Sequence, residues 1–143
     1  MWKPVLGYEG IYEVSDMGNV RSLDRVIHTV TGVSRMKPGR TLAGGVNSRG
    51  YMTVTLCDGT RKQGSNHVLV AQAFLTNPHN ARVVNHIDHN KLNNRASNLE
   101  YCSVGANIHH SIVFRENTAR LLDRAFELID RGISRDIVYT MLT

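Results

Sequence analysis

Three polar residues in the second half of the chain have side chains suited to hydrolysing a phosphodiester bond. His86 can act as a base, because neutral imidazole accepts a proton near pH 7. Asn107 can offer an amide oxygen to a hard cation, and Asn85 can offer a second one. A cation gripped between them would leave coordination positions for a phosphate oxygen and a water molecule. Mg²⁺ suits such a set of oxygen ligands.

Each of these residues also has an ordinary structural interpretation. A single histidine near a strand end is more often a hydrogen-bonded structural group than a base. The neighbouring asparagines can serve only as turn formers and loop staples; they are Asn90, Asn93, Asn94 and Asn98. Taken one at a time, the structural interpretation is the better one. Only their combination within residues 84–110 favours a catalytic site.

The elements that must position these residues follow from local patterns. The predicted order is a strand at 82–86, an Asn-rich loop at 88–98, a strand at 99–102 and a helix that Ser103 can cap and that includes Asn107 and His110. Upstream, apolar residues recur at helical spacing from His67 to Phe74, with Ser65-Asn66 as a cap and Asn77-Pro78 as a stop.

The first half of the chain is predicted to be rich in strands. Residues 12–14 and 19–23 form a hairpin around the turn formers Ser15-Asp16-Met17-Gly18. Residues 51–56 alternate between apolar and polar side chains and end at the turn Asp58-Gly59. Residues 24–50 contain many glycines and have weak periodicity, so loops and edge strands are expected there.

The C-terminal segment has a helical apolar face. Its members, which we expect to be buried, include Leu121, Leu122, Phe126 and Ile129, and Gly132 is a stop signal. Ser134 can cap a final helix through Leu142. The pair resembles the opening half of a helix-turn-helix, although the chain ends where a recognition helix would begin. An amphipathic pair that covers the core or a partner chain is the alternative.

Composition narrows the class of protein. The chain has 143 residues, 41% of them hydrophobic and 20% charged, which is typical of one globular domain with at most a small appendage. No apolar stretch approaches the roughly 20 residues of a membrane span, and no signal peptide is evident, so we expect a soluble, cytoplasmic protein. The two cysteines do not form a CxxC pair, which argues against a zinc knuckle.

Positive charge is concentrated in one segment. The net charge is +5, and residues 18–62 hold eight basic residues against two acidic ones. Interspersed Gly, Ser and Thr can also donate hydrogen bonds to phosphate oxygens, which favours a nucleic-acid partner. The candidate DNA contacts are Arg21, Arg35, Lys37, Arg40, Arg49, Arg61 and Lys62.

Three separated blocks of sequence resemble a known family. Residues 84–101 read VNHIDHNKLNNRASNLEY and are followed by Asn107. This pattern resembles the HNH nucleases encoded by phages and mobile introns. Residues 2–10 (WKPVLGYEG) and 12–22 (YEVSDMGNVRS) resemble the small module that precedes the nuclease motif in HNH homing endonucleases. Gly50-Tyr51, residues 67–74 and Asn77-Pro78 fall in the same order as in that family.

The resemblance implies a ββα-metal finger, in which two strands and a helix hold one divalent ion, Mg²⁺ or Mn²⁺. It assigns His86 as the general base, Asn98 as the residue that braces the loop, and Asn107 as a metal ligand. His110, one helical turn further on, could touch the scissile phosphate. Asn85 departs from the pattern, because relatives carry an aspartate there as the other metal ligand.

The resulting expectation is an α+β protein with three parts. They are a β-rich DNA-binding module at 1–66, an HNH nuclease core at 67–112 and a C-terminal helical tail at 113–143. The implied function is metal-dependent hydrolysis of double-stranded DNA, within the host cytoplasm if the gene is phage-borne. The alternative is a catalytically weakened relative that binds DNA or, through the tail, a protein partner or a second copy.

Overall fold

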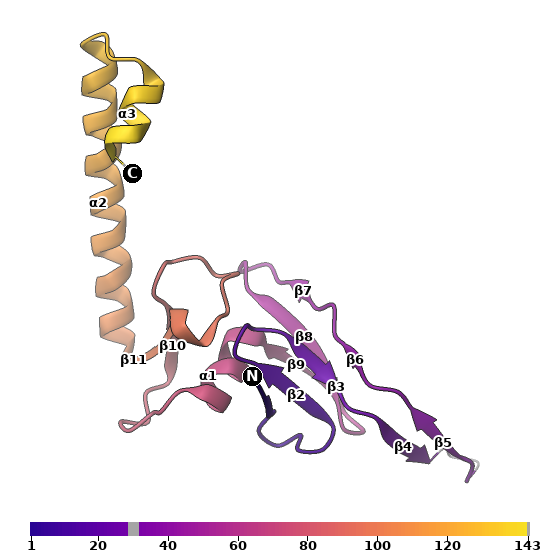
Figure 1. Ribbon diagram of the computed structural model, residues 1–143. Helices are drawn as coiled ribbons and strands as arrows, with labels where there is room; N and C mark the ends of the chain where they lie inside the picture. Colours follow the sequence, from indigo (N-terminus) through magenta and orange to yellow (C-terminus); the bar gives the residue numbers. More distant parts are fainter. Residues whose placement is uncertain (29–31, 143) are drawn as a thin grey trace. The chain divides into compact units, whose positions relative to one another are not determined.

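A computed structural model describes residues 1–28 and 32–142 of the chain. It has an α+β fold built from antiparallel strands and a few helices (Figure 1), as expected from the sequence. The chain divides into two compact units, Met1–Ser103 and Val104–Thr143.

The first unit begins with a four-stranded sheet in the order β1-β2-β3-β6. The strands are β1 (Trp2–Pro4), β2 (Tyr12–Ser15), β3 (Val20–Ser22) and β6 (Arg40–Thr41). The predicted hairpin is confirmed, because β2 and β3 pair antiparallel, with Tyr12 opposite Ser22. The buried positions of β2 and β3 include Val14 and Val20, which face the core.

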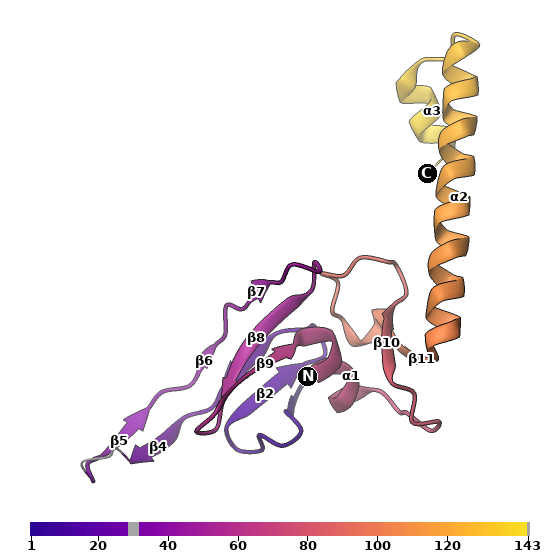
Figure 2. The ribbon, with the colours of Figure 1, turned by 180° about the vertical axis from the view of Figure 1, so that it is seen from behind.

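Two further sheets complete the β structure of this unit. The strands β4 (Arg25–His28) and β5 (Ser34–Lys37) form a hairpin, and β7 (Gly45–Val46), β8 (Met52–Cys57) and β9 (Arg61–Ser65) form a three-stranded sheet. Short strands and loops thus fill 24–50 as predicted, with 29–31 lying outside the described residues. Figures 1 and 2 both show the β4–β5 hairpin at the end of the unit far from β10.

One helix, α1 (Asn66–Phe74), contacts strands of several sheets, including β2, β8 and β11. Its residues Leu69, Val70 and Ala71 are buried. Leu69 and Val70 join a single core whose other members are Val5, Tyr12, Val14, Val20, Val54, Leu56 and Leu99. Ser65 occupies the N-cap position as expected, but its hydroxyl makes no capping hydrogen bond. Packing of the apolar residues, rather than the cap, therefore stabilises this helix.

The predicted strand, loop and strand follow α1 in the expected order. The strands β10 (Val83–His86) and β11 (Leu99–Cys102) pair antiparallel, with His86 opposite Leu99. The loop between them ends in a short 3₁₀ helix, η1 (Ala96–Asn98). Leu99 belongs to the core, so it ties this two-stranded ribbon to α1 and the larger sheets.

The second unit consists of α2 (Val104–Asp130) and α3 (Arg135–Leu142). The helix that carries Asn107 and the apolar helix of the tail are one continuous helix. Gly132 ends it with a positive φ of 83°, as predicted. No helix among the described residues is long and apolar enough to span a membrane.

The prediction that the tail's apolar face is buried is wrong for most of its members. Leu121, Leu122 and Phe126 are exposed, the last to 65%. The physical reason is that α3 has only eight residues and cannot cover the 27 residues of α2. Val138 of α3 is buried, so the two helices do contact each other.

The predicted functional boundaries differ from the division into compact units. The boundary at 66/67 falls at the start of α1, and the boundary at 112/113 falls inside α2. By packing, the β-rich module and the β10–β11 ribbon form one unit because they share a core. The separate functions assigned to the three parts stay a prediction.

The shared core predicts that a cavity in α1 will destabilise the N-terminal sheet. Val70 is fully buried, so Val70→Ala should lower the free energy of unfolding by about 2 kcal/mol. Trp2, the single tryptophan, lies in β1 and reports on that sheet by its fluorescence during urea unfolding.

The control is Val26→Ala on the exposed β4 strand, which should change stability by no more than about 0.5 kcal/mol. If Val70→Ala leaves the Trp2 transition where it is in the wild type, the sheet and α1 do not unfold together.

Candidate active site

The candidate site lies at the end of β10. Asn85 and His86 are adjacent on this strand, and both are buried, His86 to 4% exposure. Successive side chains of a strand point to opposite faces, so the side chains of Asn85 and His86 contact different neighbours. Across the ribbon, Asn85 is opposite Glu100 and His86 is opposite Leu99.

The amide of Asn85 is oriented by its cross-strand neighbour. Asn85 Nδ2 donates a hydrogen bond to Glu100 Oε1 at 2.9 Å. This bond places a carboxylate beside a position where the resemblance leads one to expect an aspartate. Negative charge is thus present at the site although position 85 itself is neutral.

Asn98 holds the loop between β10 and β11 closed. Its Nδ2 donates to Asp88 Oδ1 (2.8 Å) and to the Asn93 carbonyl (2.9 Å), while its Oδ1 accepts from the Asp88 backbone N–H (3.2 Å). Hydrogen bonds from Asn93, then from Asn98, lower the pKa of Asp88. The contacts of Asn98 agree with the bracing role that the resemblance implies for it.

His86 is surrounded by polar and aromatic side chains. Its Nε2 lies 3.0 Å from Asn94 Oδ1, and this contact is buried. The ring centroid of His67 lies 5.1 Å away, and that of Tyr51 lies 6.0 Å away. Lys91 Nζ sits 4.8 Å from the Tyr51 ring centroid, which places a cation near this group.

His67 is a buried neutral neighbour of the candidate base. Burial first, and then the charge interaction with His86, lower the pKa of His67 from 6.5 to about 4. The Nδ1 atom of His67 is buried without a hydrogen-bond partner in the described part of the chain. At neutral pH this imidazole therefore adds no positive charge beside His86.

Asn107 and His110 belong to the second unit, where both lie near the start of α2 and are half-buried. The Asn107 carbonyl accepts a hydrogen bond from Ser111 Oγ at 3.0 Å. The first unit brings Asn85, His86 and the Asn98-braced loop together.

The predicted DNA contacts lie mostly on exposed strands and loops of the first unit. The exposed residues are Arg35 and Lys37 on β5, Arg40 on β6, Arg49 before β8, and Arg61 and Lys62 on β9. Arg21 differs, because its guanidinium donates to Glu13 Oε2 at 2.6 and 2.8 Å and stacks on the Trp2 ring. Its charge is already paired within the protein.

Sequence reasoning missed several residues that surround His86. Asn94 was considered as a turn former, His67 as the start of a helix and Tyr51 as part of a strand. All three lie in blocks that resemble the HNH family, but none was assigned a role at the site. Asn94 is eight residues from His86 across an irregular loop, so no periodicity indicates their contact. The one available signal was the density of asparagines in a loop beside a candidate base.

Comparison with known proteins identifies the class. Residues 1–57 match the NUMOD4 motif. The structure superposes on a solved structure of the HNH homing endonuclease I-HmuI, described as showing DNA binding and cleavage, with a TM-score of 0.66 and 28% identity. That match covers 89% of this chain and 68% of the other. The chain therefore shares the fold of an HNH homing endonuclease.

Sequence relatives agree with this class. The chain is 35% and 37% identical to the uncharacterized HNH endonucleases L245 and L247 of Acanthamoeba polyphaga mimivirus, and 33% identical to DNA endonuclease I-HmuI of Bacillus phage SP01. Each match covers 78% of this chain but only 29%, 26% and 57% of the respective relative. The chain thus spans between about a quarter and just over half of their lengths. These similarities confirm the resemblance to HNH homing endonucleases seen in the sequence.

The lowered pKa of His67 predicts a pH-dependent stability. The unfolded chain protonates this residue near pH 6.5, whereas the folded protein resists protonation until about pH 4. The free energy of unfolding should therefore fall as the pH drops from 6.5 toward 4, by up to about 3 kcal/mol from this residue. Urea unfolding at a series of pH values measures the slope.

His67→Phe should flatten that slope, whereas His79→Phe, at an exposed position, should keep it. Equal slopes in the wild type and His67→Phe would show that His67 is not held neutral by burial.

Proposed function

We propose that this protein is a metal-dependent DNA endonuclease that hydrolyses phosphodiester bonds of double-stranded DNA, with the site at the end of β10. The observation that carries the proposal is the buried His86 at a strand end, held against Asn94 and flanked by Asn85. Similarity to DNA endonuclease I-HmuI supports it. Relatives in a phage and a giant virus support a role in the cytoplasm of a host cell.

HNH endonucleases use a divalent metal ion, and the residues of this chain fit one. The Asn85 amide is oriented by its bond to the Glu100 carboxylate, which adds negative charge beside a neutral oxygen donor. Oxygen donors of this kind suit Mg²⁺ or Mn²⁺. We propose that Asn85 and Asn107 hold one such ion. When bound, the ion would polarise the scissile phosphate and neutralise charge on the leaving oxygen.

The chain's own residues supply the remaining chemistry. His86 accepts the proton of the attacking water through the ring nitrogen that does not face Asn94. Asn98 keeps the loop closed, so that the residues beside His86 stay in place. His110 contacts the scissile phosphate. His67 remains neutral, so it adds no positive charge beside the base.

The exposed basic residues grip the DNA backbone in this proposal. In the β4–β5 hairpin, Arg35 is opposite Ile27 and Lys37 is opposite Arg25, so these side chains share one face. The narrow, basic two-stranded hairpin has a form that can enter a DNA groove. Arg40 lines two neighbouring surface concavities, and Arg49, Arg61 and Lys62 extend the positive surface. Arg21 contributes least, since Glu13 already neutralises it.

The function is tested by relaxation of supercoiled plasmid. The wild-type protein should nick plasmid with Mg²⁺ or Mn²⁺ and should be inactive with EDTA. His86→Ala should lower the nicking rate by about 100-fold or more, because it removes the base from the chemical step. Its affinity for DNA should change less than about threefold, as the phosphate grip lies elsewhere.

His79→Ala is the matched control, because His79 is exposed and lies outside the loop that follows β10. It should retain wild-type nicking. Activity of His86→Ala within a few-fold of the wild type would remove His86 from the mechanism.

The neutral side chain of Asn85 leads to a prediction about metal affinity, which can be tested separately from the role of His86. Asn85→Asp replaces a neutral ligand by a charged one and places it beside Glu100, so it should bind Mg²⁺ more tightly without DNA and need less Mg²⁺ for half-maximal nicking. In metal-free buffer the same variant should be less stable, because two carboxylates face each other. Isothermal titration and urea unfolding measure the two effects.

Asn107→Ala should abolish nicking both in the wild-type chain and in the Asn85→Asp variant. If Asn85→Asp binds Mg²⁺ and Mn²⁺ no better than the wild type, and its metal dependence of nicking is unmoved, position 85 does not face the ion.

A further inference from the structure

We propose that Asn94, backed by Gly18 of the β2–β3 turn, is a positioning residue that fixes the tautomer and orientation of His86. The N-terminal module would then act on the geometry of the base as well as on DNA. The inference rests on the proposed function, in which His86 is the general base.

The hydrogen bonds of Asn94 select one tautomer of His86. Asn94 Nδ2 donates to the Leu92 carbonyl at 3.3 Å, which directs Oδ1 toward the imidazole. Oδ1 lies 3.0 Å from His86 Nε2 and is an acceptor only, so Nε2 must carry the hydrogen. In the neutral ring, Nδ1 is then the unprotonated nitrogen that can accept a proton. Both residues are buried, so an unmet bond here would be costly.

The turn between β2 and β3 packs directly against Asn94. A Cβ atom added to Gly18 would lie 2.7 Å from Asn94 Cβ and 3.0 Å from the Asn94 carbonyl oxygen. No side chain fits in that space, and Gly18 has a φ of +89°, which L side chains rarely adopt. The backbone of the turn is therefore the surface against which Asn94 rests.

Hydrogen bonds attach this turn to the two elements on either side of the site. The Asp16 carbonyl accepts from the backbone N–H of Ala96, at 2.8 Å, in the loop that contains Asn94. The Gly18 carbonyl accepts from Asn66 Nδ2 of α1 at 2.9 Å, and this bond is buried. The turn thus bridges α1, which carries His67, and the loop that carries Asn94.

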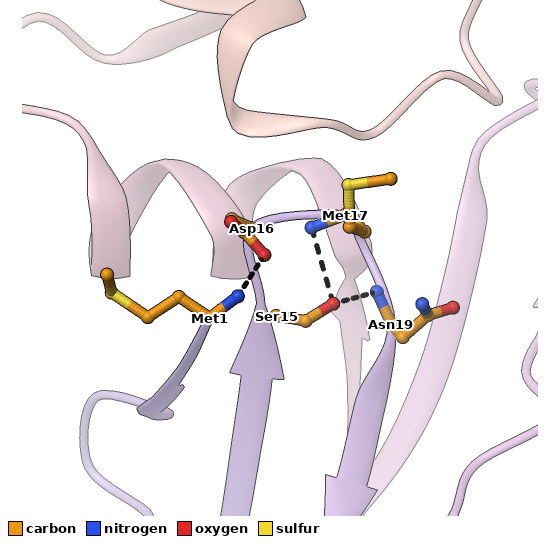
Figure 3. A network of polar contacts seen from close by, with 5 residues as sticks. All are labelled: Met1, Ser15, Asp16, Met17 and Asn19. Atoms are coloured by element: carbon orange, nitrogen blue, oxygen red, sulfur yellow. Dashed lines mark hydrogen bonds and ion pairs between the residues drawn. The ribbon is translucent and has the colours of Figure 1, made fainter.

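Hydrogen bonds and an ion pair of its own residues also stabilise the β2–β3 turn. Ser15 Oγ accepts from the backbone N–H groups of Met17 (3.3 Å) and Asn19 (3.0 Å), and Asp16 Oδ1 contacts the Met1 amino group at 2.6 Å (Figure 3). Ser15 is buried, so its bonds are shielded from water. A turn fixed in this way can act as a rigid support for Asn94.

The first experiment compares Asn94→Leu with Asn94→Asp in the full-length chain. Long-range ¹H–¹⁵N correlation in mildly alkaline buffer reports which nitrogen of His86 carries the hydrogen, with His86→Ala used for assignment. The wild type and Asn94→Asp, which keeps an acceptor, should show the Nε2–H form. Asn94→Leu should lose that preference.

Nicking kinetics give the second readout. Asn94→Leu should lower kcat roughly 10- to 100-fold with little change in KM, and Asn94→Asp should recover most of the loss. A purely structural role for Asn94 would not produce this rescue together with a restored tautomer. An Nδ1–H form in the wild type, or an unchanged tautomer and kcat in Asn94→Leu, would overturn the inference.

The role of Gly18 is tested by making the same alanine substitution at a second glycine with a positive φ, Gly10. Gly18→Ala and Gly10→Ala impose similar backbone strain, with φ of +89° and +76°, but an added Cβ meets Asn94 only at position 18. Gly18→Ala should shift the His86 ring signals and lower kcat, whereas Gly10→Ala should change neither. Equal effects of the two variants would overturn the role of the turn.

These measurements separate the inference from the proposed function. If the wild type shows no metal-dependent nicking, the proposed function fails, but the tautomer of His86 and its response to Asn94→Leu and Gly18→Ala still decide whether this support exists.

Discussion

The structure of the first unit depends on burial of one face of α1. Leu69, Val70 and Ala71 are inaccessible to water because strands of three sheets close around them. None of these sheets has more than four strands, and sheets of that size need packing against another element to be stable. A single short helix supplies that packing to all of them. The N-terminal module and the β10–β11 ribbon consequently share a core.

This shared core explains why the candidate catalytic residue His86 can be held so closely by distant parts of the chain. His67 comes from α1, Tyr51 precedes β8, and Asn94 lies in the loop after β10. The apolar core fixes the elements, and the asparagines then fix the loop by hydrogen bonds, chiefly those of Asn98 to Asp88 and Asn93. Polar bonds alone would give little net stability, but beside a packed core they determine which conformation is adopted.

The candidate site and the candidate DNA-binding surface differ in their charge. Near His86 the chain uses neutral amides, so charge there comes from Glu100, from Lys91 beside Tyr51 and from any bound cation. On the strands further out, basic residues are exposed, and within the described part of the chain most of them form no ion pair with an acidic side chain. Arg21 shows the exception, because a partner opposite it in the sheet register, Glu13, turns a candidate phosphate contact into an internal ion pair.

Much of the local structure and of the candidate chemistry was determined by the sequence. The β2–β3 hairpin, the alternating strand β8, helix α1 and the β10–loop–β11 order follow from turn residues and periodicity, which act over a few residues. The resemblance of separated sequence blocks, above all residues 84–101 followed by Asn107, was enough to indicate the HNH class. The continuous helix α2 and its exposed Phe126 were not foreseen, since a helical pattern shows an apolar face but not what covers it.

Only the tertiary structure decided which side chains meet. The contacts of Asn94 with His86 and with Gly18 join positions that are far apart or irregularly spaced in the chain, so no local pattern encodes them. The same holds for the pairing of Arg21 with Glu13, which depends on strand register, and for the lowered pKa of His67, which depends on burial. Local sequence sets the elements, whereas long-range packing sets the surroundings of each functional group, because burial and contact are properties of the whole unit.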